Sequence, residues 1–259
     1  KKEGFQGVEI SLYGTTPDRL TKVFSKANSL GLNIFCGTGV DGEHDPSSEE
    51  PNIRKNALQY LKNCIDIAAQ GNACAINGVL YAPWQAFSDI PKEKRWENSA
   101  QVLREAAEYG AEKGIDLHVE VINRFESDFM NTLEEGAAFL EKVNHAHVKL
   151  LVDTFHMNIE EDNIPEAIRL AGRKLGHLHV GESNRKLPGM GSLPWRDIGR
   201  ALRDIGYEKG VVMEPFLLQG GEVARDCKVW RDLSGNADEK MLDRYIKESL
   251  TFLKHEFTF

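Results

Sequence analysis

Four residues with metal-binding side chains recur along the second half of the chain. They are Glu120, Asp153, His179 and Glu214, and they are separated by 33, 26 and 35 residues. Each lies near the end of a short apolar run that is followed by a longer amphipathic stretch. Carboxylate oxygens with one imidazole nitrogen suit a divalent cation that keeps open positions for a substrate. The four residues are therefore candidates for one metal site, provided that the fold brings them together.

The apolar runs predict the elements that would position these side chains. Runs typical of buried parallel strands cover residues 8–13, 32–38, 74–81, 116–122, 148–155, 175–182 and 210–216. Amphipathic stretches that predict helices cover residues 17–30, 52–70, 93–113, 132–143, 165–173, 193–205 and 239–252. Strands that alternate with helices in this way predict a parallel sheet with right-handed crossovers. We therefore predict an α/β fold, a single (β/α)₈ or TIM-barrel domain over residues 1–259.

The count of strand–helix units qualifies this prediction. Seven units are visible, whereas a closed barrel of this type needs about eight. We expect the first βα unit, roughly 30 residues, to be missing from the printed chain. The alternative architecture is an open, doubly wound sheet. No glycine-rich phosphate loop follows any of the apolar runs, and this favours the barrel.

Alternation of side chains along a strand indicates which way the four candidates face. In the run 116–122, Glu120 points away from Val119 and Val121, and the same parity holds for the other three candidates. All four can therefore face the barrel interior at its functional, C-terminal end. Isolated charges are costly to bury there, and a divalent cation removes that cost. We expect Mn²⁺, with Mg²⁺ or Co²⁺ as possibilities; the alternative is a buried network of hydrogen bonds or ion pairs. His118 and His177, one layer deeper, are expected to pack in the core.

Composition limits the partners. The net charge is −8, with 40 acidic against 32 basic residues, which argues against a nucleic-acid partner. No apolar run approaches the roughly 18 residues of a membrane span, and residues 1–10 lack an apolar signal region. The four cysteines show no paired CxxC spacing and are expected to be reduced thiols, which favours a cytoplasmic location.

Several segments together resemble one family. They are EVINRFE (120–126), VDTFHMNIEE (152–161), GHLHVGESNRKLPG (176–189), MEPF (213–216) and KVWRDLS (228–234). In this order and spacing the chain resembles the ketose 3-epimerases, which include the D-tagatose and D-psicose (allulose) 3-epimerases, within the xylose isomerase-like barrels. The resemblance covers most of the chain after residue 115, and the first half agrees more loosely.

The resemblance implies the same four metal ligands and adds contacts to a sugar. Glu126, His156 and Arg185 would contact substrate oxygens, and Phe216 would line the pocket. Trp84 would form a stacking wall for the sugar. We place Glu126 and His156 in the loops that follow their strands. The resemblance also implies a free ketose as the small-molecule partner and a homodimer or homotetramer.

The chemistry of epimerisation assigns a second role to two of the ligands. Inverting C3 of a ketose removes a proton beside the C2 carbonyl and returns it to the other face, through an enediolate, so two acid/base groups are needed. Glu120 and Glu214, at the two ends of the ligand arc, are the predicted pair, and the enzyme would be an isomerase. An aldose–ketose or hydroxypyruvate-type isomerase would need one base. A metal-dependent endonuclease would need a basic surface, and a sugar-binding barrel would perform no exchange.

Overall fold

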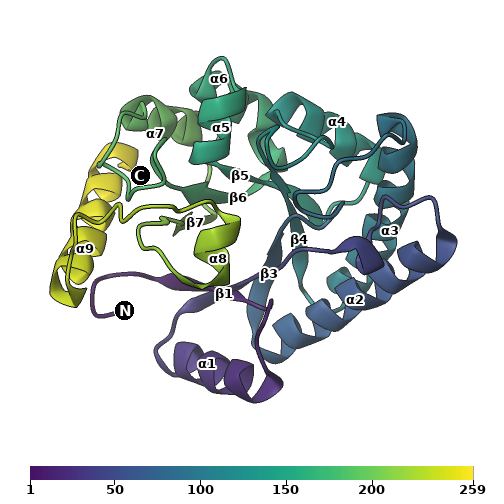
Figure 1. The fold of residues 1–259 in the computed structure, drawn as a ribbon, viewed down its shortest axis with the longest axis horizontal. Coiled ribbons are helices and arrows are strands. Elements are labelled where there is room, and N and C mark those ends of the chain that lie inside the picture. The colour runs from purple at the N-terminus through teal and green to yellow at the C-terminus, as the bar shows by residue number, and fades with distance from the viewer. Residues whose placement is uncertain (259) are drawn as a thin grey trace.

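Seven parallel strands form the centre of the computed structural model, which describes residues 1–258 (Figure 1). The strands pair in chain order from β1 to β7. They are β1 (Gly7–Ser11), β2 (Asn33–Gly37), β3 (Ala73–Gly78), β4 (Asp116–Val121), β5 (Val148–Asp153), β6 (Leu175–Val180) and β7 (Gly210–Met213). The predicted α/β barrel with seven visible strands is therefore confirmed.

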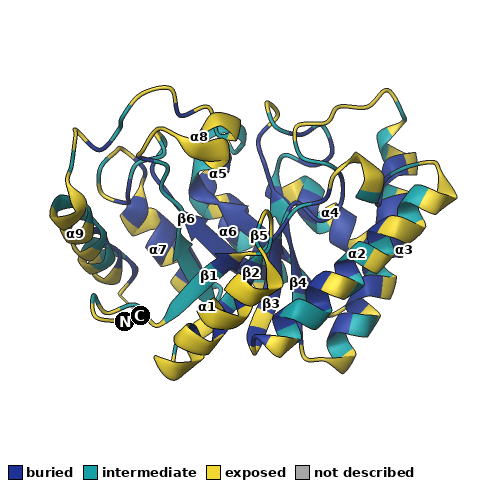
Figure 2. Ribbon diagram, turned by 60° about the horizontal axis from the view of Figure 1, so that its bottom comes forward, coloured by how far each residue is buried: buried dark blue, intermediate teal, exposed yellow. Residues whose placement is uncertain are grey.

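Burial differs between the middle and the edges of this sheet. In β6 every residue is buried, and in β5 all but one are. Figure 2 shows these central strands in the dark blue of buried residues, with helices around them that expose their outer faces. The edge strands β1 and β7 are only partly buried; they approach each other, but the pairing of the described residues does not run between them. The barrel is nearly closed.

Helices cover the outside of the strands. They are α1 (Pro17–Ser29), α2 (Pro51–Gln70), α3 (Lys92–Glu112), α4 (Leu133–Val143), α5 (Thr154–Glu160), α6 (Ile164–Ala171), α7 (Trp195–Asp204), α8 (Gly221–Asp226) and α9 (Glu239–Phe257), with 3₁₀ turns at Gly42–His44 and Gly172–Lys174. Side-chain caps begin several of them: Thr16 accepts from the Arg19 N–H, and Thr132 accepts from the Glu135 N–H. These caps fix where each strand-to-helix loop ends.

Two short helices were not predicted, and one of them moves a site residue. The run 148–155 was predicted as strand throughout, but β5 ends at Asp153. The Asp153 carboxylate accepts a 2.8 Å hydrogen bond from the Phe155 N–H and so caps α5. His156 therefore lies in a helix, and its placement in a loop was wrong. The second helix, α8, lies in the long segment between β7 and α9.

Two further expectations concern residues away from the barrel mouth. The four cysteines, Cys36, Cys64, Cys74 and Cys227, are free thiols, as predicted. Within the part of the chain that the structure describes, no helix is both long enough and apolar enough to cross a membrane.

Candidate metal centre and substrate pocket

The four predicted ligands come together at the C-terminal ends of four neighbouring strands. Asp153 and His179 are register partners of β5 and β6, Glu120 lies near the end of β4, and Glu214 follows β7 directly. The Nδ1 atom of His179 lies 3.9 Å from Glu120 Oε1 and 3.6 Å from Glu214 Oε1. The parity argument thus placed these side chains on the same side of the strands as the structure does.

The donor atoms fit a divalent cation. Ligand atoms of Glu120, His179 and Glu214 all lie within 4.8 Å of one another, and so do those of Glu120, Asp153 and His156. The Nδ1 atom of His179 is buried and has no hydrogen-bond partner. A buried nitrogen of this kind is normally paired, so its orientation toward two carboxylates indicates a ligand position. Glu120 belongs to both groups, Asp153 shares only the second of them, and each group combines two carboxylates with one imidazole. Donors of this kind match a hard divalent ion such as Mn²⁺ or Mg²⁺.

The pKa shifts of the candidate ligands favour the binding of a cation. Burial raises the pKa of Glu120 well above its usual range, and the nearby Glu214 and Asp153 raise it further. Burial alone would lower the pKa of His179, but the carboxylates of Glu214 and Glu9 outweigh it and raise this pKa. At Glu214 burial also opposes charge, but His179 and Arg185 outweigh it and lower the pKa of this carboxyl. Glu120 is therefore the carboxylate whose charge a bound cation would stabilise most.

Arg185 lies over the same carboxylates. Its Nη1 atom is 2.5 Å from Asp153 Oδ2 and 3.3 Å from Glu214 Oε2. The guanidinium carbon lies 3.9 Å from the ring centre of Phe155 and 5.0 Å from that of Phe216. These two rings hold the guanidinium plane at the mouth of the barrel. Arg185 and Phe216, which the family resemblance places at the substrate, therefore lie beside the candidate metal ligands.

The loop that carries Arg185 is fixed by a residue that sequence reasoning missed. Glu182 is fully buried, and its carboxylate accepts hydrogen bonds from the N–H groups of Gly189 (2.7 Å) and Leu193 (3.3 Å) and from Trp195 Nε1 (2.7 Å). Arg185 itself has a φ of +61°, in the left-handed region. Its strained backbone is held in place by the bonds on either side of it.

A second group of predicted residues lies beside Glu120 and Arg185. The Trp84 indole N–H donates to Glu126 Oε2 at 2.8 Å, and the Asn123 amide donates to Glu126 Oε1 at 2.8 Å. The same amide lies 2.7 Å from Nδ1 of His156, whose Nε2 is 3.9 Å from Glu120 Oε1. Trp84, Glu126 and His156 therefore form one connected wall, with Asn123 as its unpredicted link.

The contacts of Asn123 decide which nitrogen of His156 carries a proton. The Asn123 oxygen accepts from the Phe125 N–H at 2.9 Å, so the amide nitrogen faces His156. The backbone N–H of Asn123 also donates to His156 Nδ1, at 3.3 Å. Burial lowers the pKa of His156 to about 3, so the ring is neutral. Two donors on Nδ1 outweigh a longer 3.4 Å contact between Arg185 Nη2 and Nε2. His156 therefore presents an N–H from Nε2 to the pocket.

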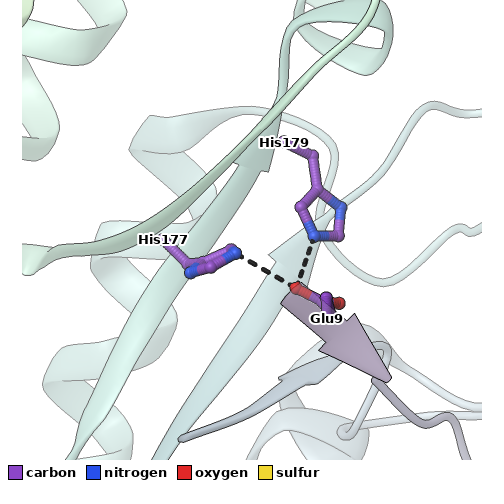
Figure 3. A group of neighbouring side chains, drawn as sticks. All are labelled: Glu9, His177 and His179. Atoms are coloured by element: carbon purple, nitrogen blue, oxygen red, sulfur yellow. Dashed lines mark hydrogen bonds and ion pairs between the residues drawn. The ribbon is translucent and has the colours of Figure 1, made fainter. Parts of the chain in front are cut away.

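A third unpredicted residue lies beneath the candidate ligands. The Glu9 side chain, from β1, points toward the imidazole of His179, and its Oε2 atom lies 3.1 Å from His179 Nε2 (Figure 3). The same oxygen is 3.1 Å from His177 Nε2. His177 is completely buried, as expected for a core residue. Burial opposes charge on Glu9, but His179 and His177 outweigh it and lower the pKa of Glu9 far below its usual range.

Comparison with known proteins assigns the class of this fold and site. Residues 1–233 match the family described as xylose isomerase-like TIM barrel, and the chain belongs to that family. Within it, the resemblance to ketose 3-epimerases is confirmed by close relatives, and with it the expectation of an isomerase-class enzyme.

The particular relatives are named for one sugar. A D-psicose 3-epimerase of Ruminiclostridium cellulolyticum is 46% identical over 259 residues, which cover 98% of this chain and 88% of the relative. A D-psicose 3-epimerase of Agrobacterium fabrum is 38% identical, with 97% and 89% covered. A crystal structure of D-psicose 3-epimerase with D-tagatose from Clostridium cellulolyticum H10 superimposes with a TM-score of 0.94 at 43% identity, over 99% of this chain and 90% of that one.

Proposed function

We propose that this chain is a metal-dependent ketose 3-epimerase that interconverts D-psicose and D-fructose. The observation that carries the proposal is the pair of carboxylates, Glu120 and Glu214, on two sides of a buried and unpartnered His179 Nδ1. The choice of sugar is supported by relatives named D-psicose 3-epimerase at 38–46% identity, whereas those named L-ribulose 3-epimerase reach 29%.

The metal would be held by Glu120, Asp153, His179 and Glu214, with Mn²⁺ as the proposed ion. When bound, a divalent cation supplies Lewis-acid polarisation of the sugar oxygens. In our scheme one glutamate of the Glu120–Glu214 pair takes the C3 proton, the electrons of the broken C3–H bond form the C2–C3 double bond of an enediolate, and the C2 carbonyl electrons move to O2. The other glutamate, which is protonated at the start, then gives its proton to C3 from the opposite face, and the C2 carbonyl forms again. Because the reaction is reversible, the configuration of the substrate decides which glutamate acts first.

The remaining pocket residues orient the sugar in this scheme. Arg185 provides a planar fork of N–H donors for O2, where negative charge develops. The Nε2–H of His156 donates to an oxygen at the carbonyl end, and Glu126 accepts from a hydroxyl. Phe216 and Trp84 exclude water on either side. The indole ring of Trp84 is oriented by its bond to Glu126, which supports its role as a wall.

The test is proton exchange in D₂O. A panel of ketoses is incubated with the protein and Mn²⁺ and followed by NMR, with an EDTA-treated sample as the control. We expect deuterium at C3 together with the C3 epimer, fastest for D-psicose, and loss of both after EDTA treatment. An aldose product with label at C1 or C2 would instead assign the chain to the isomerases. No exchange in any sugar would support a sugar-binding barrel.

Variants at the two glutamates sharpen this test. Glu120→Gln and Glu214→Gln each remove an acid/base group, and we expect both to lose exchange by more than about 100-fold. The matched control is Glu208→Gln, at an exposed position shortly before β7, which should exchange at the wild-type rate. Near-normal exchange in a folded Glu214→Gln protein would contradict the two-base scheme.

Two further proposals concern the assembly and its location. A homodimer or homotetramer is supported by large apolar side chains that stand exposed around α8, including Leu218, Val223 and Trp230. Light scattering on the purified protein would test this. A cytoplasmic location is supported by the four free thiols.

A further inference from the structure

A carboxylate on one wall of the barrel is bonded to a candidate metal ligand on another. Glu9 lies on β1 and His179 on β6, two strands that are not neighbours in the sheet. Figure 3 shows Glu9 pointing toward both His179 and His177. The Nε2 atom of His179 lies 3.1 Å from Glu9 Oε2, at hydrogen-bond distance. The proposed function uses the other ring nitrogen of His179 and assigns no role to Glu9.

The orientation of the Glu9 carboxylate is fixed from β3. The Asn77 amide donates to the same Oε2 atom at 2.7 Å. The Asn77 oxygen lies 2.8 Å from Nδ1 of His118, which orients the amide group. Asn77 is fully buried and His118 is nearly so. Glu9 is therefore an acceptor that buried donors hold in one place, and not a side chain free to move.

This placement decides what the two nitrogens of His179 can do. With Glu9 Oε2 as the acceptor, Nε2 carries a proton and donates it. An imidazole that binds a metal is neutral, with one N–H and one lone pair, so in that form the lone pair is on Nδ1. Nδ1 is the atom that is buried without a partner and that lies 3.6 Å from Glu214 and 3.9 Å from Glu120. A carboxylate behind a metal-binding histidine orients the ring and increases its basicity.

We propose that Glu9 is a positioning residue for His179, which holds the imidazole with Nδ1 directed at the cation. This inference rests on the proposed metal-dependent function. It adds a residue of the first strand to a site whose candidate ligands all come from the later strands β4–β7.

The same atoms offer a competing arrangement. Ligand atoms of Glu9, His177 and His179 lie within 4.8 Å of one another and could hold an ion themselves. That ion would take the lone pair of Nε2 and so place the proton of His179 on Nδ1. One neutral ring cannot supply lone pairs to both sites, so the two arrangements exclude each other. Positioning is favoured, because Nδ1 already faces two carboxylates at 3.6 and 3.9 Å, beyond hydrogen-bond distance, and makes no hydrogen bond of its own.

Metal affinity, measured without turnover, tests the proposal. Metal-stripped wild-type protein, Glu9→Leu and Glu9→Gln are titrated with Mn²⁺, and free Mn²⁺ is followed by EPR. We expect one ion per chain in the wild type and a Kd about 100-fold higher in Glu9→Leu, at the upper end for loss of such a partner. Glu9→Gln keeps the shape and an acceptor oxygen but loses the charge, so its Kd should rise by about 10-fold.

A control variant separates this role from packing. The ring of Phe35 lies 4.6 Å from that of His177, in the same region of the barrel, and has no polar contact with His179. Phe35→Leu should therefore leave the Mn²⁺ Kd within about twofold of the wild type. Thermal unfolding of the metal-free proteins shows whether each variant is folded. If Glu9→Leu does not fold, Glu9→Gln decides the question.

The outcomes distinguish failure of this proposal from failure of the proposed function. A wild type that binds no Mn²⁺ overturns the metal site and the role of Glu9 with it. A wild type that binds Mn²⁺, with a Glu9→Gln protein of unchanged Kd, overturns the positioning role alone. A lower unfolding temperature with no change in Kd would show that Glu9 acts only in folding. Two ions per chain, one of them lost in His177→Phe, would show that the Glu9 cluster is itself a metal site.

Discussion

Replacing Asn123 should impair catalysis although Asn123 would touch neither the metal nor the reacting carbon. Its amide donates to Glu126 Oε1 at 2.8 Å and to His156 Nδ1 at 2.7 Å. The Asn123→Leu substitution keeps the approximate volume of the side chain and removes both bonds. His156 Nδ1 would then keep only the longer 3.3 Å bond from the backbone N–H of residue 123, so its ring would be held less firmly. Glu126 would lose one of the two donors that orient it.

The expected size follows from the two bonds. A neutral hydrogen bond contributes about 0.5–1.5 kcal/mol, and one to a charged group contributes about 1.5–3 kcal/mol. Their sum is about 2–4.5 kcal/mol if both are needed in the transition state. At about 1.36 kcal/mol for each factor of ten, this predicts a loss of roughly 30- to 2,000-fold in kcat/KM. Asn123→Asp should lose at least as much, because the new carboxylate would accept the proton of His156 at Nδ1 and leave Nε2 without one.

Steady-state kinetics with D-psicose and Mn²⁺, together with circular dichroism to confirm folding, would measure this effect. The matched control is Ser127→Ala, which removes the hydrogen bond that the Ser127 hydroxyl accepts from the Phe129 N–H in the same loop and leaves the side-chain bonds of Glu126 and His156 in place. It should stay within about threefold of the wild type. A folded Asn123→Leu protein whose kcat/KM also stays within threefold would refute the reasoning from the tautomer of His156.

Three other predictions use different parts of the chain. The pKa of Glu160 is lowered, because hydrogen bonds and charge from Arg124 outweigh burial. The Glu160 carboxylate therefore stabilises the fold at pH values above its unfolded pKa of about 4.3, and this stabilisation is lost as pH falls through the folded pKa. In urea unfolding, the difference between wild type and Glu160→Gln should be constant from pH 8 to about 5.5 and shrink below about 4.5. Gly78 has a φ of +130°, and a Cβ there would lie 2.1 Å from the Thr38 carbonyl oxygen. Gly78→Ala should therefore lower the free energy of unfolding by about 3 kcal/mol or prevent folding. The control is Gly42→Ala, where a Cβ meets open space and the loss should be less than about 1 kcal/mol. Mn²⁺ at about 100 times its Kd should add about 2.7 kcal/mol of stability that EDTA removes, and an unfolding temperature that ignores Mn²⁺ would count against the metal site.

The barrel and its four candidate ligands could be predicted because both depend on local patterns. Strands such as β5 and β6 are buried on both faces and appear in the sequence as continuous apolar runs. A polar residue at the end of such a run is conspicuous, and the alternation of side chains gives its direction. Asp153 and His179 were identifiable for this reason, before any distance was known.

The residues that were missed depend on contacts between distant parts of the chain. Glu9 is separated from His179 by 170 positions, and nothing near Glu9 in the sequence indicates its partner. Glu182 lies within the segment 176–189 that also contains Arg185, but its role becomes visible only when its carboxylate is found buried and bonded to three donors. The boundary between β5 and α5 was hidden because Asp153 ends one apolar run and caps the helix that continues it.

The short edge strand β7 has a consequence for motion within the site. Its four residues are all only partly buried, whereas β6 beside it is buried throughout. Backbone amides of an edge element open to solvent more often than those of a central strand. Amide hydrogen exchange should therefore be fastest in β7 among the strands that carry the candidate ligands. Asp153 and His179 lie on strands that we expect to exchange slowly, whereas Glu214 directly follows a strand that we expect to fluctuate. In the proposed scheme, one acid/base group would therefore adjust its reach toward the sugar while the centre of the site keeps its shape.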